Sequence, residues 1–202
     1  MIVALLGTST ITSCKKKEEE KKVDEKAVAD SIAKAEAAKK AEVKPAEDPK
    51  NLASPPDSTT VTINKANIKI AYSKPSVKGR PIWGTLVPYN EVWRAGANAA
   101  TVFSTDKDIM VEGKKLPAGQ YSLFMIPTEK DWTIIFDKTL KQWGSFKYDK
   151  DGKTDALRVT VKPTKVDAAQ EVLKYEIVPT KGNLTGNVEL TWEKIKVSFK
   201  VK

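Results

Sequence analysis

The sequence predicts an all-β domain of antiparallel strands, folded as a single β-sandwich or barrel-like unit. Two observations support this fold class. Apolar residues recur at every second position in seven short runs, which is the pattern of half-buried strands. Turn-forming residues separate these runs at short intervals, and no convincing helical pattern lies between them. A third observation concerns where the domain begins. Residues 15–50 are highly charged and contain no aromatic residue, so we expect the domain to start after them, at about residue 54.

The predicted strands follow one another along residues 54–202. The alternating runs are 61–63, 68–72, 132–136, 157–161, 173–177, 188–192 and 195–201. Predicted turns lie at Glu112-Gly113, Pro117-Ala118-Gly119, Asp151-Gly152 and Lys181-Gly182-Asn183. Residues 74–99 break the alternation, since they are rich in Gly, Pro and aromatic side chains and long for a plain loop.

The chain opens with an apolar stretch that ends at its single cysteine, Cys14. The stretch is too short to span a bilayer, which takes about 20 apolar residues, but it suits the hydrophobic region of a signal peptide. Ile11-Thr12-Ser13-Cys14 resembles the lipobox of bacterial lipoproteins, with an aliphatic residue three positions before the cysteine and a small one directly before it. We therefore expect residues 1–13 to be a cleaved signal peptide and Cys14 to carry acyl chains that anchor the protein.

Two other interpretations of Cys14 stay open at this point. The residue could be an ordinary thiol in the leader, or an N-terminal nucleophile of the amidotransferase type. The second needs an ordered pocket, whereas Cys14 is followed directly by a charged run.

Residues 14–53 are predicted to be a lipid-anchored tether, flexible and partly helical. Positions 15–50 hold 11 Lys and 10 Asp or Glu, and Ala, Lys and Glu between Val23 and Val43 favour helix. A solvated spacer explains this composition, and a helix with a partner is the alternative. Four prolines then end the helix and mark the domain boundary: Pro45, Pro49, Pro55 and Pro56.

Composition excludes several function classes. Residues 54–202 carry a net charge of +8 (24 basic minus 16 acidic), yet only three of the basic residues are arginine. The lysines are dispersed and often alternate with apolar residues, so we expect no nucleic-acid partner. The chain has no histidine, which removes Ser-His-Asp chemistry and the commonest metal ligand. We expect no cofactor and no metal site.

The irregular segment contains four motifs: Tyr72-Ser73-Lys74-Pro75, Gly79-Arg80, Val87-Pro88-Tyr89-Asn90 and Trp93-Arg94-Ala95-Gly96-Ala97-Asn98. On these motifs the chain resembles the bacterial domain-of-unknown-function family numbered 2911, whose members are secreted or lipid-anchored. It departs from the family pattern at Lys74 (usually Arg), Asn90 (usually Gly) and Ala95 (usually Thr). The resemblance implies a β-rich domain outside the cytoplasm and brings no established activity.

The same segment supplies the candidate binding residues, which combine ring-stacking and polar side chains. These are Tyr72, Lys74, Arg80, Tyr89, Glu91, Trp93, Arg94 and Asn98. The alternative is a covering loop in which Trp83 and Trp93 plug one end of the domain and Arg94 is a structural tie. A third interpretation is a glycan hydrolase with Glu91 as acid or base, which requires a second carboxylate at about 5–9.5 Å.

Together these patterns predict a lipid-anchored cell-envelope protein, on the periplasmic side or at the outer-membrane surface. We expect a non-catalytic structural or interaction module. Its partners would be membrane lipid, through acylated Cys14, and a glycan or an envelope protein. The alternative is a carbohydrate or small-ligand binding protein that uses residues 72–98.

Overall fold

The computed structural model describes residues 53–202. Cys14, the expected signal peptide and all of the expected tether except Ala53 lie outside the described residues. Within residues 53–202 the regular elements are ten β-strands, so the all-β prediction is confirmed. None of these residues forms a helix with the length and apolar character needed to cross a membrane.

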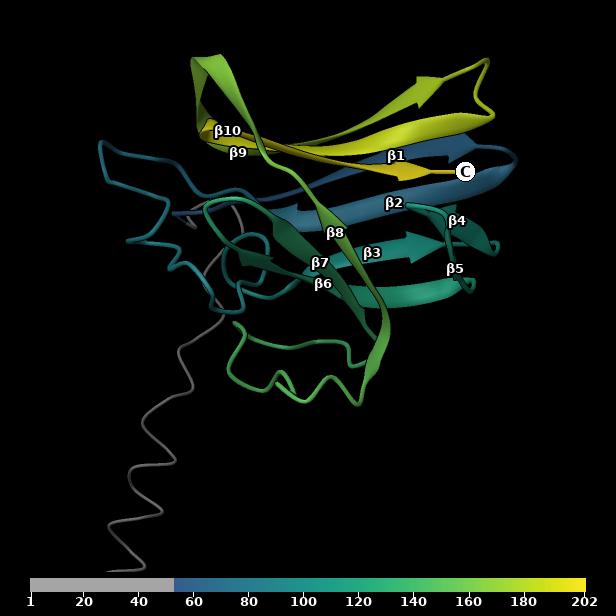
Figure 1. The fold of residues 1–202 in the computed structure, drawn as a ribbon, viewed down its shortest axis with the longest axis horizontal. Coiled ribbons are helices and arrows are strands. Elements are labelled where there is room, and N and C mark those ends of the chain that lie inside the picture. Colours follow the sequence, from purple (N-terminus) through teal and green to yellow (C-terminus); the bar gives the residue numbers. More distant parts are fainter. Residues whose placement is uncertain (1–52) are drawn as a thin grey trace, which may run out of the picture. The chain divides into compact units, whose positions relative to one another are not determined.

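The strands form two antiparallel sheets that face each other (Figure 1). The larger sheet has the order β1-β2-β3-β6-β7-β8 and the smaller one β5-β4-β10-β9. This arrangement is a sandwich and not a closed barrel, which decides between the two predicted forms. The bounds are β1 Pro56–Ile63, β2 Ala66–Ser73, β3 Thr101–Thr105, β4 Ile109–Val111, β5 Lys114–Leu116, β6 Gly119–Pro127, β7 Trp132–Asp137, β8 Asp155–Val161, β9 Thr164–Thr180 and β10 Thr185–Val201.

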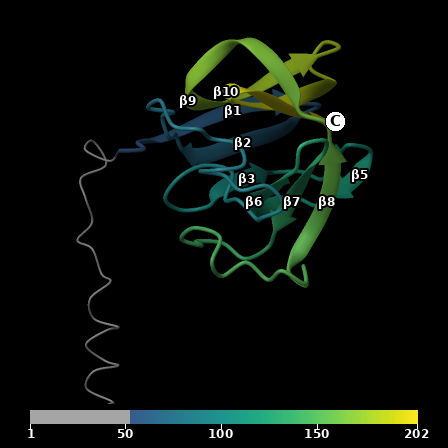
Figure 2. The same ribbon diagram turned by 60° about the vertical axis from the view of Figure 1, so that its left-hand side comes forward.

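Local sequence explains the tight turns between neighbouring strands. Ile63 pairs with Ala66, so Asn64 and Lys65 alone join β1 to β2. Their φ angles of 46° and 67° match the two-residue turn whose twist suits antiparallel strands, and Asn is one of the residues that tolerate it. At the far end of the chain β9 and β10 form a hairpin of two 17-residue strands, which curls over the larger sheet in both views (Figures 1 and 2).

The core lies between the sheets, and its aromatic side chains come from both. Phe103 and Phe136 of the larger sheet lie edge-to-face at 5.1 Å, and Phe136 meets Phe199 of β10 at 5.8 Å. All three rings are at most 2% exposed. Edge-to-face pairs add to the free energy of burial, so this cluster is one of the contacts that hold the two layers together.

All seven predicted runs lie in strands, but β3 to β6 carried no clear alternation. In β6 five consecutive residues, 121–125, are buried, because Phe124 also packs on the outer face of the sheet against Tyr148. A strand covered on both faces loses its period of two. In β3 the buried positions 101 and 105 are threonines, which read as polar in the sequence.

Candidate functional site

Residues 74–100, which contain most of the candidate binding residues, connect β2 to β3 (Figure 1). The segment forms only isolated bridges, among them Trp93 with Met125 and Ser76 with Val172. Ile82, Val87 and Ala95 from this segment are buried in the main core. The segment is therefore an integral part of the packed domain.

Trp93 belongs to a four-tryptophan cluster, which we define as Trp83, Trp93, Trp132 and Trp192. Trp93 stacks on Trp192 with ring centroids 6.0 Å apart, and Trp83 lies edge-to-face with Trp132 at 4.8 Å. Trp93 is 8% exposed and its indole N–H donates to the Gly96 carbonyl at 3.2 Å. Its ring is thus engaged by the protein itself.

Tyr72 and Lys74 converge on one carboxylate. The Tyr72 hydroxyl donates to Asp57 at 3.5 Å, and the Lys74 ammonium lies 3.1 Å from the same oxygen. Tyr72 also accepts a hydrogen bond from the Tyr175 backbone N–H at 3.2 Å. The Lys74 hydrogen bond lowers the pKa of Asp57, and burial raises the pKa of Tyr72. This network links β1, β2 and β9.

Arg80 and Asn98 bond to the protein backbone. Arg80 donates to the carbonyls of Ser76 at 2.6 Å and Val77 at 3.0 Å, although its side chain is exposed. Asn98 donates its amide to the Ser54 carbonyl at 3.0 Å. Both side chains hold chain segments in place, Arg80 within its own turn and Asn98 at the start of the described chain.

Arg94 is different, because part of its half-buried guanidinium has no hydrogen-bond partner within the described residues. Its Nε atom is inaccessible to solvent and makes no hydrogen bond within residues 53–202, and the same holds for the indole nitrogen of Trp83. Burial lowers the pKa of Arg94. Two desolvated donors without acceptors within residues 53–202 are costly, and an ordered water or a bound acceptor that reached them would offset that cost.

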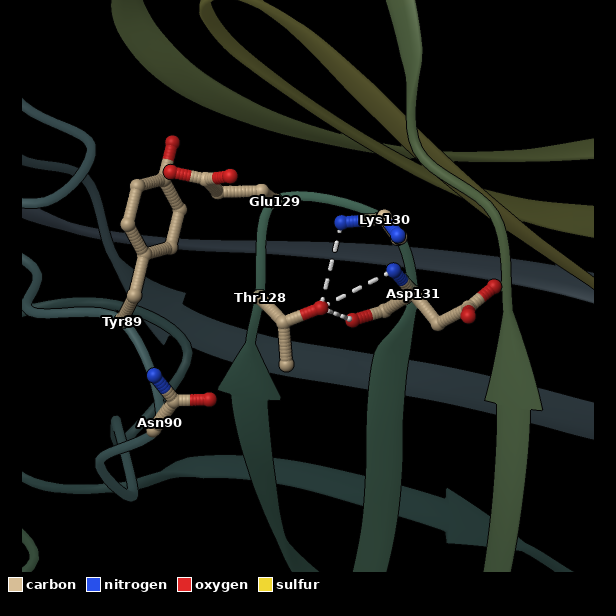
Figure 3. Close-up of a pocket in the computed structure, with 6 residues that line it drawn as sticks. All are labelled: Tyr89, Asn90, Thr128, Glu129, Lys130 and Asp131. Carbon is tan, nitrogen blue, oxygen red and sulfur yellow. Dashed lines mark hydrogen bonds between the residues drawn. The ribbon is translucent and has the colours of Figure 1, made fainter.

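Tyr89 and Glu91 line separate hollows. Tyr89 and Asn90 form one wall of an open hollow of about 400 Å³, and residues 128–131 of the β6–β7 turn form the other (Figure 3). Thr128 braces this turn, because its hydroxyl donates to the Asp131 carbonyl at 2.7 Å and accepts from the Asp131 N–H at 3.0 Å. The eight candidate residues are therefore not gathered around one cavity.

Glu91 lines a second hollow of about 370 Å³ together with Val92, Ser145, Phe146, Tyr148 and Lys150. Glu91 is exposed and its carboxylate lies 3.7 Å from the Lys150 ammonium. Of the residues that line this hollow, Glu91 alone carries a carboxylate. The hollow thus offers one acidic group, where glycoside hydrolysis uses two.

The most exposed aromatic side chains lie elsewhere, in residues 138–154 between β7 and β8, which we call the aromatic–lysine loop. Trp143 is 67% exposed and Phe146 is 87% exposed, and Leu140 adds a third exposed apolar side chain. Three exposed lysines flank them: Lys138, Lys141 and Lys147. The sequence reasoning missed this loop, although an unusual mixture of Trp, Phe and lysine in a charged turn region was a visible signal.

The aromatic–lysine loop is held by internal hydrogen bonds. Buried Asp137 accepts from the Thr139 N–H, from the Gln142 amide at 3.1 Å and from the Thr154 hydroxyl. The Tyr148 hydroxyl donates to Asp155 at 3.0 Å. Gln142 and Tyr148 are therefore buried, whereas Trp143 and Phe146, two of the loop's largest apolar side chains, are exposed.

Fold and geometry define an all-β sandwich domain whose connecting segment 74–100 is packed into the core. The chain belongs to the family described as "Protein of unknown function (DUF2911)", whose model matches residues 54–201. This confirms the family predicted from the motifs. No curated protein and no solved structure matches the chain.

The structure shows the backbone conformation or the contact at each of the three positions, 74, 90 and 95, where the sequence departs from the family motifs. Asn90 and Ala95 have φ angles of 64° and 53°, in the left-handed region that glycine adopts freely and Asn tolerates better than most. Lys74 keeps a positive charge against Asp57. Asn90 and Ala95 both carry a Cβ atom in the left-handed region, and Ala tolerates the conformation less well than Asn does.

Proposed function

We propose that this chain is a lipid-anchored cell-envelope protein whose β domain is a non-catalytic interaction module. The observation that carries the second part is the internal engagement of five of the eight candidate residues, Tyr72, Lys74, Arg80, Trp93 and Asn98. Trp93 stacks within the four-tryptophan cluster, Lys74 neutralises Asp57, and Asn98 holds the Ser54 backbone. Side chains committed to such contacts stabilise a domain and are not free to do chemistry on a substrate.

The anchor rests on the sequence Ile11-Thr12-Ser13-Cys14, which lies outside the described residues. Acyl chains on Cys14 would hold the domain at a membrane, because each buried methylene contributes about 0.8 kcal/mol and two or three chains give stable attachment. The charged stretch that follows would then link the domain to the anchor.

Metabolic labelling with a clickable fatty acid tests the anchor directly. In a bacterium with lipoprotein-processing enzymes, the wild-type chain should take up the label and stay with membranes through a high-salt wash. Cys14→Ser should take up no label and be removed by the wash. Ser9→Ala, in the same leader but outside the lipobox, is the matched control. Absence of label in the wild type would refute the anchor.

A second candidate function is small-ligand or glycan binding through residues 72–98. The buried Arg94 Nε and Trp83 indole nitrogen, which make no hydrogen bond within residues 53–202, favour it, because a bound acceptor would offset their desolvation. A thermal-shift screen with envelope glycans and small metabolites tests this function. A stabilising compound whose effect disappears in Arg94→Met, but not in Arg80→Met, would establish the site. A screen without stabilising compounds favours the module alone.

A further inference from the structure

We propose that the aromatic–lysine loop is a membrane-docking loop, which inserts Trp143 and Phe146 at the headgroup level of a bilayer rich in anionic phospholipid. The inference deepens the proposed function, since it names the surface that the module contacts. The argument begins with exposure. Two large aromatic side chains that are 67% and 87% exposed, three positions apart in one loop that also exposes Leu140, are candidates for contact with a partner.

The outward position of the two rings is built into the loop. Ala99 bridges Trp143, and the Gly144 N–H donates to the Asn98 carbonyl at 3.1 Å. A Cβ atom on Gly144 would lie 2.7 Å from the Phe146 ring, so that ring rests directly against the loop backbone. Gln142 is buried and its neighbour Trp143 is exposed. The bridge to Ala99 and the hydrogen bond to Asn98 hold this part of the loop against the domain.

The positive charge of the aromatic–lysine loop favours a negatively charged partner. Residues 138–153 contain five lysines and two aspartates, a net charge of +3 (5 minus 2). Two of the lysines form ion pairs, Lys150 with Glu91 and Lys153 with Asp151. Within residues 53–202 the other three, Lys138, Lys141 and Lys147, form no ion pair.

Aromatic and aliphatic side chains surrounded by unpaired lysines match an anionic bilayer surface. Tryptophan favours the headgroup region, lysine interacts with lipid phosphates, and Phe and Leu partition into the outer acyl layer. A glycan site would instead require polar side chains that fix hydroxyl groups, whereas the exposed side chains of Leu140, Trp143 and Phe146 are apolar.

The start of the described chain lies near the same loop. Asn98 donates its side-chain amide to the Ser54 carbonyl and accepts from the Gly144 N–H through its own carbonyl. One residue therefore ties Ser54 to the aromatic–lysine loop. If Cys14 is acylated as proposed above, the anchored chain enters the domain at Ser54, next to the aromatic–lysine loop. The tether then raises the local concentration of bilayer around a weakly binding loop.

Vesicle sedimentation with the full chain carrying Cys14→Ser tests the docking loop without any acyl anchor. The chain should bind vesicles of phosphatidylglycerol and phosphatidylcholine, with a blue shift of Trp143 emission, and should bind phosphatidylcholine alone more weakly. Trp143→Ala with Phe146→Ala should lower the partition coefficient about tenfold or more, given the usual value of burying such side chains. Leu184→Ala, an exposed apolar side chain on the β9–β10 turn, is the matched control.

A second variant changes charge and keeps both rings. Lys138→Gln with Lys141→Gln and Lys147→Gln should abolish the preference for phosphatidylglycerol, whereas Lys162→Gln with Lys165→Gln and Lys181→Gln should retain it. Absence of binding to anionic vesicles, or equal binding by the loop variants and the wild type, would overturn the proposal. Loop-dependent sedimentation with insoluble cell-wall glycan but not with vesicles would overturn it in favour of a glycan platform.

The two proposals can fail separately. A wild-type chain that takes up no fatty acid, while the Cys14→Ser chain still binds anionic vesicles through Trp143 and Phe146, refutes the anchor and supports the docking loop. Fatty-acid uptake at Cys14 without vesicle binding by the loop gives the opposite result.

Discussion

The hydroxyl of Tyr175 donates to the carbonyl of Ala95 at 2.9 Å, and so joins β9 to the segment between β2 and β3. Tyr175 is 3% exposed, and burial raises its pKa well above the usual tyrosine value. The Ala95 carbonyl also accepts from the Thr101 hydroxyl at 2.8 Å. One buried acceptor therefore joins β9 to the end of the segment 74–100 and to the start of β3.

Tyr175→Phe should lower the free energy of unfolding by about 1 kcal/mol, the usual net value of one hydrogen bond. The loss stays moderate because Thr101 continues to satisfy the Ala95 carbonyl. Urea denaturation measures it. Tyr89→Phe, at a half-exposed position that lines an open hollow, should leave the midpoint unchanged. Equal effects of the two substitutions would contradict the role given to this hydroxyl.

Gly96→Ala should destabilise the domain by about 1–3 kcal/mol, as overpacking does in a well-filled core. A Cβ atom there would lie 2.8 Å from the Thr101 hydroxyl oxygen and 3.2 Å from the Ser73 carbonyl oxygen. Thr101 cannot yield without losing its bond to Ala95. Gly79→Ala is the control, since a Cβ atom meets nothing within 4 Å there and only the backbone cost of about 1 kcal/mol applies. A smaller loss at 96 than at 79 would show that the site can relax.

Arg94→Met should leave the free energy of unfolding unchanged or raise it, because the variant removes a desolvated Nε without a partner in the described chain. Arg158→Met is the contrasting variant. Arg158 donates to Asp155 and to the Tyr148 hydroxyl at 2.6 Å, so its loss should be destabilising. Thermal denaturation compares the two. A large loss in Arg94→Met would identify Arg94 as a structural tie.

Alkaline pH should weaken the fold through Tyr148, whose pKa is raised from 10.0 to about 12 by burial and by its hydrogen bond to Asp155. The unfolded chain loses this proton at lower pH than the folded one. The associated stability is complete below pH 10.0 and decreases as pH rises toward about 12. Tyr148→Phe should therefore show a shallower decrease in urea midpoint across this interval. Parallel curves for variant and wild type would contradict the assignment.

The sequence predicted the strands that have one wet face. Runs such as 68–72 and 195–201 alternate because their outward positions meet solvent, and both lie in strands of the sandwich. β6 escaped prediction because its Phe124 is buried on the outer face of the sheet, where it packs against Tyr148. That cover comes from loops whose positions no local pattern encodes.

The candidate residues of segment 72–98 show the same limit. The motifs identified the family and the segment, and they could not tell which aromatic rings are buried. Trp93 and Trp143 both lie in irregular segments with charged residues nearby in the sequence. Nevertheless the Trp93 side chain is 8% exposed and the Trp143 side chain is 67% exposed.

By itself the sequence determined the β class, the family, and the features that predict an anchor at Cys14, because each depends on local composition or spacing. Only the tertiary structure decided that Trp93 is core and that Trp143 is surface. Trp93 meets Trp132 and Trp192, which arrive from β7 and β10, and burial is set by such distant partners. These tryptophan contacts fill the space between the two sheets. The most exposed aromatic side chains of the described residues are then Trp143 and Phe146 of the aromatic–lysine loop.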